Sequence, residues 1–111
     1  MSDLILDLHD AMFKNTIWPN DLLHNLADPD YLSINFNAYL DGMCAEVVFM
    51  DEGKRIVTNY YFNKKNYIQK IEMIENGESI ILYDRLVTIA EILTKLGRSH
   101  ELEKTLKLLA A

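Results

Sequence analysis

Residues 31–83 read YLSINFNAYLDGMCAEVVFMDEGKRIVTNYYFNKKNYIQKIEMIENGESIILY, and the fold of the chain depends on them. Apolar and polar residues alternate through five segments, which is the pattern of half-buried strands. The segments are residues 31–40, 43–50, 55–62, 67–74 and 79–83, separated by Asp41-Gly42, DEGK (51–54), NKKN (63–66) and ENGE (75–78). We therefore predict a four- to five-stranded antiparallel meander.

One set of side chains keeps to the same face through every predicted hairpin. Asp41-Gly42 fits a two-residue type I′ turn that pairs Leu40 with Met43, and Asn76-Gly77 gives the same signal. DEGK fits a four-residue loop, and Lys64-Lys65 fits the next tip. The predicted inner face consists of Leu32, Ile34, Phe36, Ala38, Leu40, Met43, Ala45, Val47, Phe49, Ile56, Thr58, Tyr60, Phe62, Tyr67, Gln69, Ile71, Met73, Ile80 and Leu82.

The opposite face is less polar than a solvent-facing surface should be. Its middle is predicted to carry the apolar residues Val48, Val57, Tyr61, Ile68 and Ile81. The other residues predicted on this face are Ser33, Asn35, Asn37, Tyr39, Cys44, Glu46, Met50, Arg55, Asn59, Lys70, Glu72, Ile74 and Tyr83. Apolar patches of this size are unusual on monomers. Either helices cover both faces of the sheet, or the second face meets a partner or another copy. The short chain favours the second arrangement.

Helical patterns flank the strands on both sides. The spacing of apolar residues predicts helices over 2–14 and 19–27 before the sheet, and over 85–96 and 100–111 after it. Asp28-Pro29 ends the second helix because a residue before proline leaves the helical region. Trp18 is expected to fix the angle between the first two helices, and Gly97 is expected to be a left-handed C-cap. The expected fold class is α+β, with one domain over 1–111.

Composition bounds the setting of the protein. The chain has 111 residues, half of them apolar, which is enough for one self-sufficient core. Cys44 is the only cysteine, so no intramolecular disulfide can form and a cytoplasmic location is favoured. The N-terminal residues lack the basic start of a signal peptide, and no apolar run reaches the ~20 residues of a membrane span. We expect a soluble protein that does not associate with membranes.

Charge is distributed unevenly along the chain. Residues 1–52 hold ten acidic residues and one lysine, a net charge of −9, whereas residues 53–111 hold seven acidic and ten basic residues, a net charge of +3. A nucleic-acid binder needs a continuous cationic face, so this balance argues against nucleic acid as the partner. It is compatible with steering toward a basic protein surface.

No motif predicts catalysis or a cofactor. The possible nucleophile–base partners are Cys44 with His9, His24 or His100, and their spacing brings none of them together. Paired Cys or His residues at zinc-site spacing are absent from the sequence, and its glycines belong to turns or a cap. We therefore expect no catalytic residues, no metal and no cofactor, and a protein that is not an enzyme.

One polar group on the predicted inner face keeps a pocket hypothesis open. Thr58, Tyr60, Tyr67 and Gln69 would lie there together, and a small-molecule site or an enzyme would have to use them. Clustered tyrosines beside Lys64 and Lys65 could also stack on single-stranded nucleic acid. The acidity of the chain weakens that second reading.

The functional hypothesis is an acidic, intracellular protein-binding module of inhibitor or immunity type, or a small adaptor. It would offer carboxylates from its first half to a basic partner, and the candidate contacts are Asp3, Asp7, Asp10, Tyr39 and Glu46. The alternative is a homodimeric structural scaffold that pairs through the half-apolar sheet face.

Overall fold

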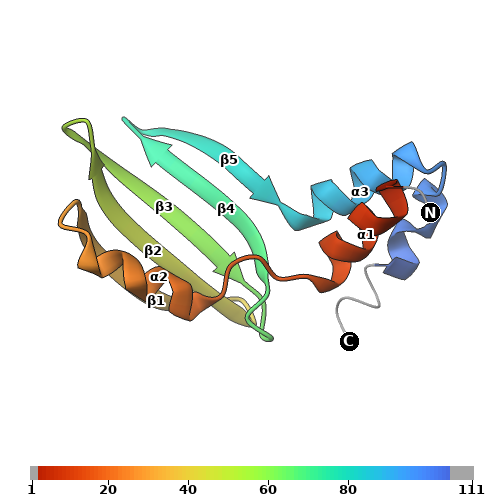
Figure 1. Ribbon diagram of the computed structural model, residues 1–111, viewed down its shortest axis with the longest axis horizontal. Helices are drawn as coiled ribbons and strands as arrows, with labels where there is room; N and C mark the ends of the chain where they lie inside the picture. The colour runs from red at the N-terminus through yellow and green to blue at the C-terminus, as the bar shows by residue number, and fades with distance from the viewer. Residues whose placement is uncertain (1–2, 106–111) are drawn as a thin grey trace. The chain divides into compact units, whose positions relative to one another are not determined.

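The computed structural model describes residues 3–105. The chain divides into two compact units: a sheet unit, Thr16–Asp84, and a helical unit, Met1–Asn15 with Arg85–Ala111. Figure 1 shows the helices and strands of both units. The predicted α+β class is confirmed, because helices precede and follow an antiparallel meander. A single domain over 1–111 stays a prediction.

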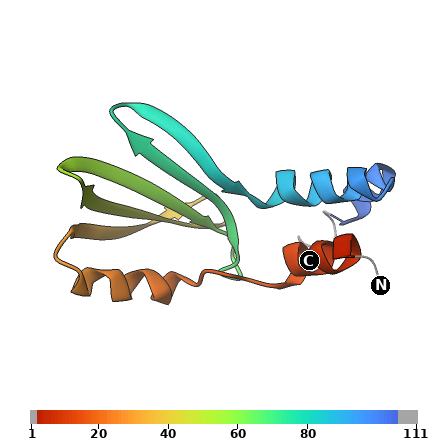
Figure 2. The ribbon, with the colours of Figure 1, turned by 45° about the horizontal axis from the view of Figure 1, so that its top comes forward.

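The sheet unit contains one five-stranded antiparallel sheet in which neighbours in sequence are neighbours in space. Its strands are β1 Tyr31–Tyr39, β2 Gly42–Asp51, β3 Lys54–Phe62, β4 Ile68–Glu75 and β5 Glu78–Asp84. Four hairpins connect them (Figure 2). The meander is therefore as predicted, with five strands.

Two hairpins are closed by tight turns that need left-handed backbone. Asn76 and Gly77 have φ values of 53° and 79°, and Glu75 pairs with Glu78 across them, as predicted. Glu52 and Gly53 have φ values of 50° and 78° and lie between the paired residues Asp51 and Lys54. The predicted four-residue DEGK loop is thus a two-residue turn with the same centre. Positive φ at both central residues is what a type I′ turn requires.

The prediction for the first turn is wrong, because the observed pairing of β1 with β2 differs from the predicted pairing by two residues. Tyr39 pairs with Gly42, so Leu40 and Asp41 form the turn, and Leu40 is 88% exposed with a φ of 52°. Gly42 lies instead at the start of β2, against the end of β3. A Cβ there would lie 2.0 Å from the carbonyl oxygen of Phe62. The glycine therefore permits a close backbone approach and does not form the turn.

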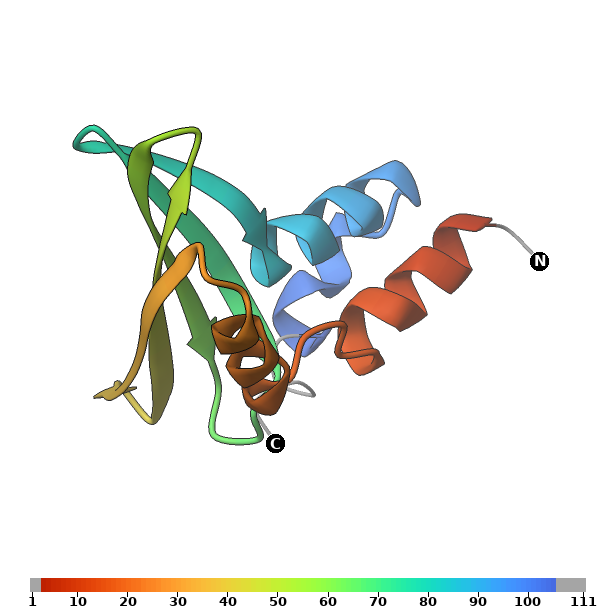
Figure 3. The same cartoon turned by 60° about the vertical axis from the view of Figure 1, so that its left-hand side comes forward.

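The inner face of the sheet packs against helix α2, Pro19–Leu23, which Figure 3 shows beside the strands. Leu22 of α2 contacts a core of Ala45, Val47, Phe62 and Ile68. Partly buried residues extend this core: Ile17, Tyr31, Ile34, Met43, Phe49, Tyr60, Ile71 and Tyr83. Most of the predicted inner set is therefore confirmed, because antiparallel pairing keeps opposed residues on one face.

Three register shifts change part of that set. They lie in β1 between Tyr31 and Ser33, in β3 between Tyr61 and Phe62, and in β4 between Ile71 and Glu72. Each shift moves the next residues to the other face, which is what a β-bulge does. Ile68 and Tyr83, predicted on the outer face, pack in the core, whereas Leu32 and Leu82 are 54% and 56% exposed.

The helical segment before β1 matches the predicted range 19–27, but it changes type along its length. Helix α2 gives way to the 3-10 helix η1, His24–Ala27. The Asp21 carboxylate accepts a hydrogen bond of 2.9 Å from the backbone N–H of Trp18, which fixes the start of α2. The Trp18 side chain is 44% exposed and stacks edge-on against Tyr67 at 5.5 Å between ring centroids, so it lies at the surface of the sheet unit.

The helical unit contains α1, Asp3–Phe13, and α3, Arg85–Lys95. Ile89, Ile92 and Leu93 of α3 are buried. Gly97 closes α3 with a φ of 71°, while the N–H groups of Gly97 and Arg98 donate to Thr94 and Leu93. This pair of bonds is a Schellman motif and confirms the predicted C-cap.

The predicted fourth helix begins as the 3-10 helix η2, Ser99–Glu101, and continues as α-helix over 102–105. Arg98 forms an ion pair with Glu101 at this point. The remaining part of that prediction, with Leu106 and Leu109, lies outside the described residues.

Arg85 joins the two helices and was not singled out in the sequence. Its side chain is only 4% exposed, and its guanidinium donates to the backbone carbonyls of Ala11 and Met12 at the end of α1. The last carbonyls of a helix lack intrahelical donors and carry partial negative charge. The buried Arg85 guanidinium supplies hydrogen-bond donors to these carbonyls and places a positive charge beside them.

Replacing Gly42 by alanine should destabilise the protein by about 2 kcal/mol, because backbone atoms must move to admit a Cβ. Gly53→Ala is the matched control: nothing lies within 4 Å of its Cβ position. It should cost about 1 kcal/mol through its positive φ alone. Urea unfolding measures both, and equal losses would contradict the close-approach role of Gly42.

Arg85→Leu should lower the free energy of unfolding by about 1–3 kcal/mol, because it leaves two helix-end carbonyls without their donors. Arg85→Lys keeps the charge and should recover part of the loss. Urea unfolding of the two variants tests this, and a leucine variant as stable as the wild type would remove the proposed role.

Candidate functional site on the outer face of the sheet

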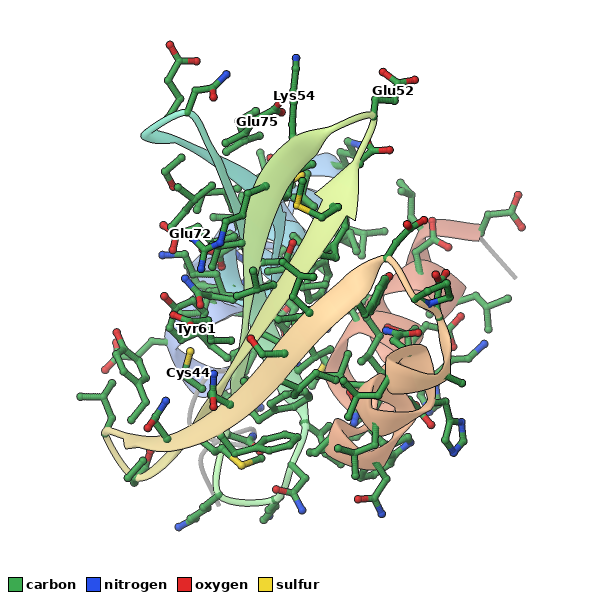
Figure 4. The ribbon with its side chains drawn as sticks, turned by 90° about the vertical axis from the view of Figure 1, so that its left-hand side faces the viewer. Cys44, Glu52, Lys54, Tyr61, Glu72 and Glu75 are labelled. Atoms are coloured by element: carbon green, nitrogen blue, oxygen red, sulfur yellow. The ribbon has the colours of Figure 1, made fainter. Side chains whose placement is uncertain are left out.

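The outer face, opposite the one that packs against α2, gathers polar side chains from all five strands. Its central residues form two neighbouring rows, set by the strand pairing. One row is Asn35, Glu46, Asn59, Glu72 and Ile81, and the next is Asn37, Cys44, Tyr61 and Lys70. Directly opposed residues on a sheet lie about 5 Å apart and can interact. Figure 4 shows Cys44, Tyr61 and Glu72 on this side.

The loop between β3 and β4 sets the register of these rows. The Asn63 side-chain oxygen accepts hydrogen bonds from the backbone N–H groups of Lys65 and Tyr67, at 2.9 and 3.0 Å. This is the local bonding by which asparagine stabilises turns. The loop therefore runs to Tyr67 and Phe62 pairs with Ile68, and an irregularity between Tyr61 and Phe62 then brings Tyr61 opposite Lys70. A tip at Lys64-Lys65, as predicted, would have placed Tyr61 opposite Ile68.

Glu72 is the best-organised group on the outer face. Its carboxylate accepts hydrogen bonds from Ser79 Oγ at 2.7 Å, Tyr61 Oη at 3.2 Å and Asn59 Nδ2 at 3.4 Å. The bond from Ser79 is the largest cause of a lowered Glu72 pKa, and the bonds from Asn59 and Tyr61 and the nearby charge of Lys70 add to it. Glu72 is thus held as an oriented carboxylate.

Tyr61 connects this carboxylate to an aromatic surface. Its ring lies 4.9 Å from that of Tyr39, centroid to centroid, and the ammonium of Lys70 lies 5.6 Å above it. Burial, followed by the charge of Glu72, raises the pKa of Tyr61 to about 12. The hydroxyl therefore stays protonated and remains a donor to Glu72. An ammonium over an aromatic ring at this distance is a cation–π contact.

Cys44 lies beside this group, in an environment that disfavours nucleophilic chemistry. Its Sγ is 3.9 Å from the Asn59 side-chain oxygen. Burial raises the pKa of the thiol, and the charges of Glu46 and Glu72 raise it further. Because the thiolate is the reactive form, a raised pKa makes this cysteine a poor nucleophile.

One end of the sheet is acidic. Figure 4 shows Glu52, Lys54 and Glu75 together there, and Lys54 pairs with Glu75 at 3.4 Å. The strand order brings six carboxylates to this end, where β1 and β5 begin: Asp28, Asp30, Asp51, Glu52, Glu75 and Glu78. Lys54 and Arg55 are the basic residues at the two tight turns here. Carboxylates from both halves of the sequence thus gather at this end of the sheet.

The structure brings together some of the predicted contact residues. Tyr39 and Glu46 lie on the outer face, Tyr39 against Tyr61, and Glu46 close enough to Cys44 to affect its pKa. Asp3, Asp7 and Asp10 lie on α1, in the other unit, where Asp3 and Asp7 are exposed and Asp10 is half-buried. Partner contact by all five stays a prediction.

The four residues of the pocket hypothesis are distributed over the core, the β3–β4 loop and strand β4. Thr58 is 4% exposed, and Tyr60 packs against the core, where burial raises its pKa. Tyr67 stacks on Trp18, and the Gln69 amide donates to the Tyr67 carbonyl at 2.9 Å. A separate open groove of about 350 Å³ is lined by Pro19, Asn20, Leu23, Phe36, Met43 and Asn66. A ligand at the four predicted residues stays a prediction.

Between residues 3 and 105, no three His, Cys, Asp or Glu side chains are placed to share a metal ion. The helices in the same range are too short or too polar to cross a membrane.

Sequence reasoning placed Cys44, Glu46, Asn59, Tyr61, Lys70 and Glu72 on one face but missed that they form a cluster. The sequence feature that could have indicated this cluster is Asn63, because an asparagine side chain can hydrogen-bond to the backbone of a turn.

Comparisons with protein-family models, with curated protein sequences and with solved structures give no match to this chain.

Glu72→Gln should lower the pKa of Tyr61 toward 10, because the neighbouring negative charge is lost. The wild-type phenol, with a pKa near 12, stabilises the folded state below about pH 10 and loses that contribution as the pH rises from 10 to 12. Titration of the Tyr61 ring carbon by NMR measures the shift, with Tyr61→Phe to assign the signal. An unchanged Tyr61 pKa in the glutamine variant would contradict the coupling.

Proposed function

We propose that the chain is a small acidic intracellular protein-binding module, of inhibitor or immunity type or an adaptor. In this proposal a basic partner surface docks on the outer face, at Tyr39, Glu46, Tyr61 and Glu72. The observation that supports it most is the position of Lys70, whose ammonium lies over the Tyr61 ring and near the Glu72 carboxylate. The protein's own lysine thus occupies a site built from an aromatic face and a carboxylate.

The chemistry of this face suits arginine and lysine side chains. A cation can stack on a tyrosine ring while it pairs with a neighbouring carboxylate, and arginine does both with a planar group. Glu72 is already oriented by three donors, so little ordering is needed when a cation arrives. Glu46 and Glu72 outnumber Lys70, which leaves one negative charge for the partner to neutralise.

Exposed tyrosine strengthens the case for a protein partner. Tyr39 is 48% exposed and packs against Tyr61, so it offers a rigid, amphipathic surface. Tyrosine is enriched among the residues that dominate binding energy at interfaces. The acidic end of the sheet and the net charge of −6 would steer a basic partner toward the sheet unit.

An arginine decapeptide serves as a defined probe in fluorescence anisotropy at low salt. Glu46→Gln and Glu72→Gln should each weaken its binding about three- to tenfold, because each removes a carboxylate from the contact. Lys70→Gln should tighten binding, because it removes the competing ammonium. The matched controls are Glu91→Gln and Lys95→Gln on α3, which make the same charge changes in the helical unit.

Equal effects of the outer-face and α3 variants would mean that the probe senses only net charge, and would contradict the proposed site. A pull-down from the source cells extends the test to the natural partner. Capture should be lost with the double variant Glu46→Gln/Glu72→Gln. Loss with Asp3, Asp7 and Asp10 changed to asparagine, and not with the double variant, would instead assign the contact to α1.

A further inference from the structure

We infer that strand β1 is a pairing edge through which two copies of this chain join antiparallel, extending the sheet across a two-fold axis. In the part of the chain that the structure describes, β1 has β2 on one side only (Figure 1). Five consecutive residues at its end, Asn35–Tyr39, are exposed, including both faces of the strand. An edge strand of this kind presents unpaired backbone groups to a second strand.

The composition of β1 is what separates it from a protected edge. Its nine residues, YLSINFNAY, include no charged residue and no proline. Natural sheets usually protect an edge with lysine, proline or inward-facing charges, and β1 has only the irregularity between Tyr31 and Ser33. The opposite edge, β5, is shorter and carries Glu78 and Asp84 at its ends.

The sequence of β1 also selects a second copy over an unrelated strand, because it is self-complementary about Asn35. Antiparallel pairing centred there opposes Asn35 to itself and uses the regular stretch Ser33–Asn37, beyond the irregularity between Tyr31 and Ser33. It places Ile34 against Phe36 of the second copy on the inner side, and Ser33 against Asn37 of the second copy on the outer side. Apolar residues thus oppose apolar ones, and polar residues oppose polar ones.

Exposed apolar surface beside β1 supports this arrangement. Phe36 of β1 is 39% exposed and Leu23 of α2 is 44% exposed, and both line the open groove of about 350 Å³. A second strand at this edge would continue the inner face and cover part of Phe36. Removing apolar surface from water favours association.

Charge gives the pairing a distinctive salt dependence. Two copies each carry a net charge of −6, and this register brings Asp30 of one copy near Asp41 of the other at each end of the paired strands. Salt screens such like-charge repulsion. Dimerisation should therefore strengthen with salt, whereas binding of the arginine decapeptide should weaken, so the failure of either proposal can be recognised separately.

Sedimentation equilibrium of the full chain at tens of micromolar should show a dimer that is favoured by salt. Asn35→Lys should weaken it at least about tenfold, because two lysines would oppose each other at the centre of the pairing. Leu82→Lys on β5, which adds the same charge at the other edge, should change it less than about twofold. A chain that is monomeric throughout, or a dimer lost with Leu82→Lys and kept with Asn35→Lys, would overturn the inference.

Disulfide trapping tests the register directly, in a Cys44→Ser background. Asn35→Cys should give a covalent dimer on oxidation, because directly opposed residues lie about 5 Å apart, within disulfide reach. Asn37→Cys is the matched control: it shares residue type, face and exposure, but its counterpart lies four residues along the strand, about 13 Å away. Equal trapping of the two variants would overturn the pairing about Asn35.

Discussion

The side chain of Asn63 fixes the relation between the first three strands and the last two. By accepting the N–H groups of Lys65 and Tyr67, it closes a five-residue loop and sets the register of β3 against β4. The loop places Ile68 opposite Phe62 in the core, and the irregularity between Tyr61 and Phe62 then aligns Tyr61 with Lys70 and Asn59 with Glu72. The packing of the inner face and the polar cluster of the outer face therefore depend on this loop together with the irregularity beside it.

The sequence was sufficient to predict the helices, the meander and the face of most strand residues, because alternation with a period of two survives small errors in the turns. The register of the strand pairs was harder to predict. Gly42 looked like a turn residue, but the close approach of β2 to Phe62 requires it. The bulge that turns Tyr83 inward has no pattern of its own in one sequence. For the same reason the cluster around Glu72 could not be assembled, although each member was on the correct face.

The outer face combines features that are individually common and together suit cation recognition. A carboxylate held by three donors keeps its charge, an aromatic pair offers a flat surface, and Lys70 already occupies part of that surface. The raised pKa of Cys44 lowers the thiolate fraction of the thiol beside them. The proposed binding of a basic partner rests on these contacts. The uncharged edge β1 adds a second kind of surface, which depends on backbone pairing and apolar contact instead of charge.

The claim on which the account depends most is that the Asn63 loop organises the outer-face site. NMR titration of the Glu72 carboxyl carbon in the wild type and in Asn63→Ala tests it directly. We expect a Glu72 pKa below the ordinary glutamate value in the wild type, and a return toward that value once the loop loses its side-chain acceptor. The same lowered pKa in both proteins would contradict it.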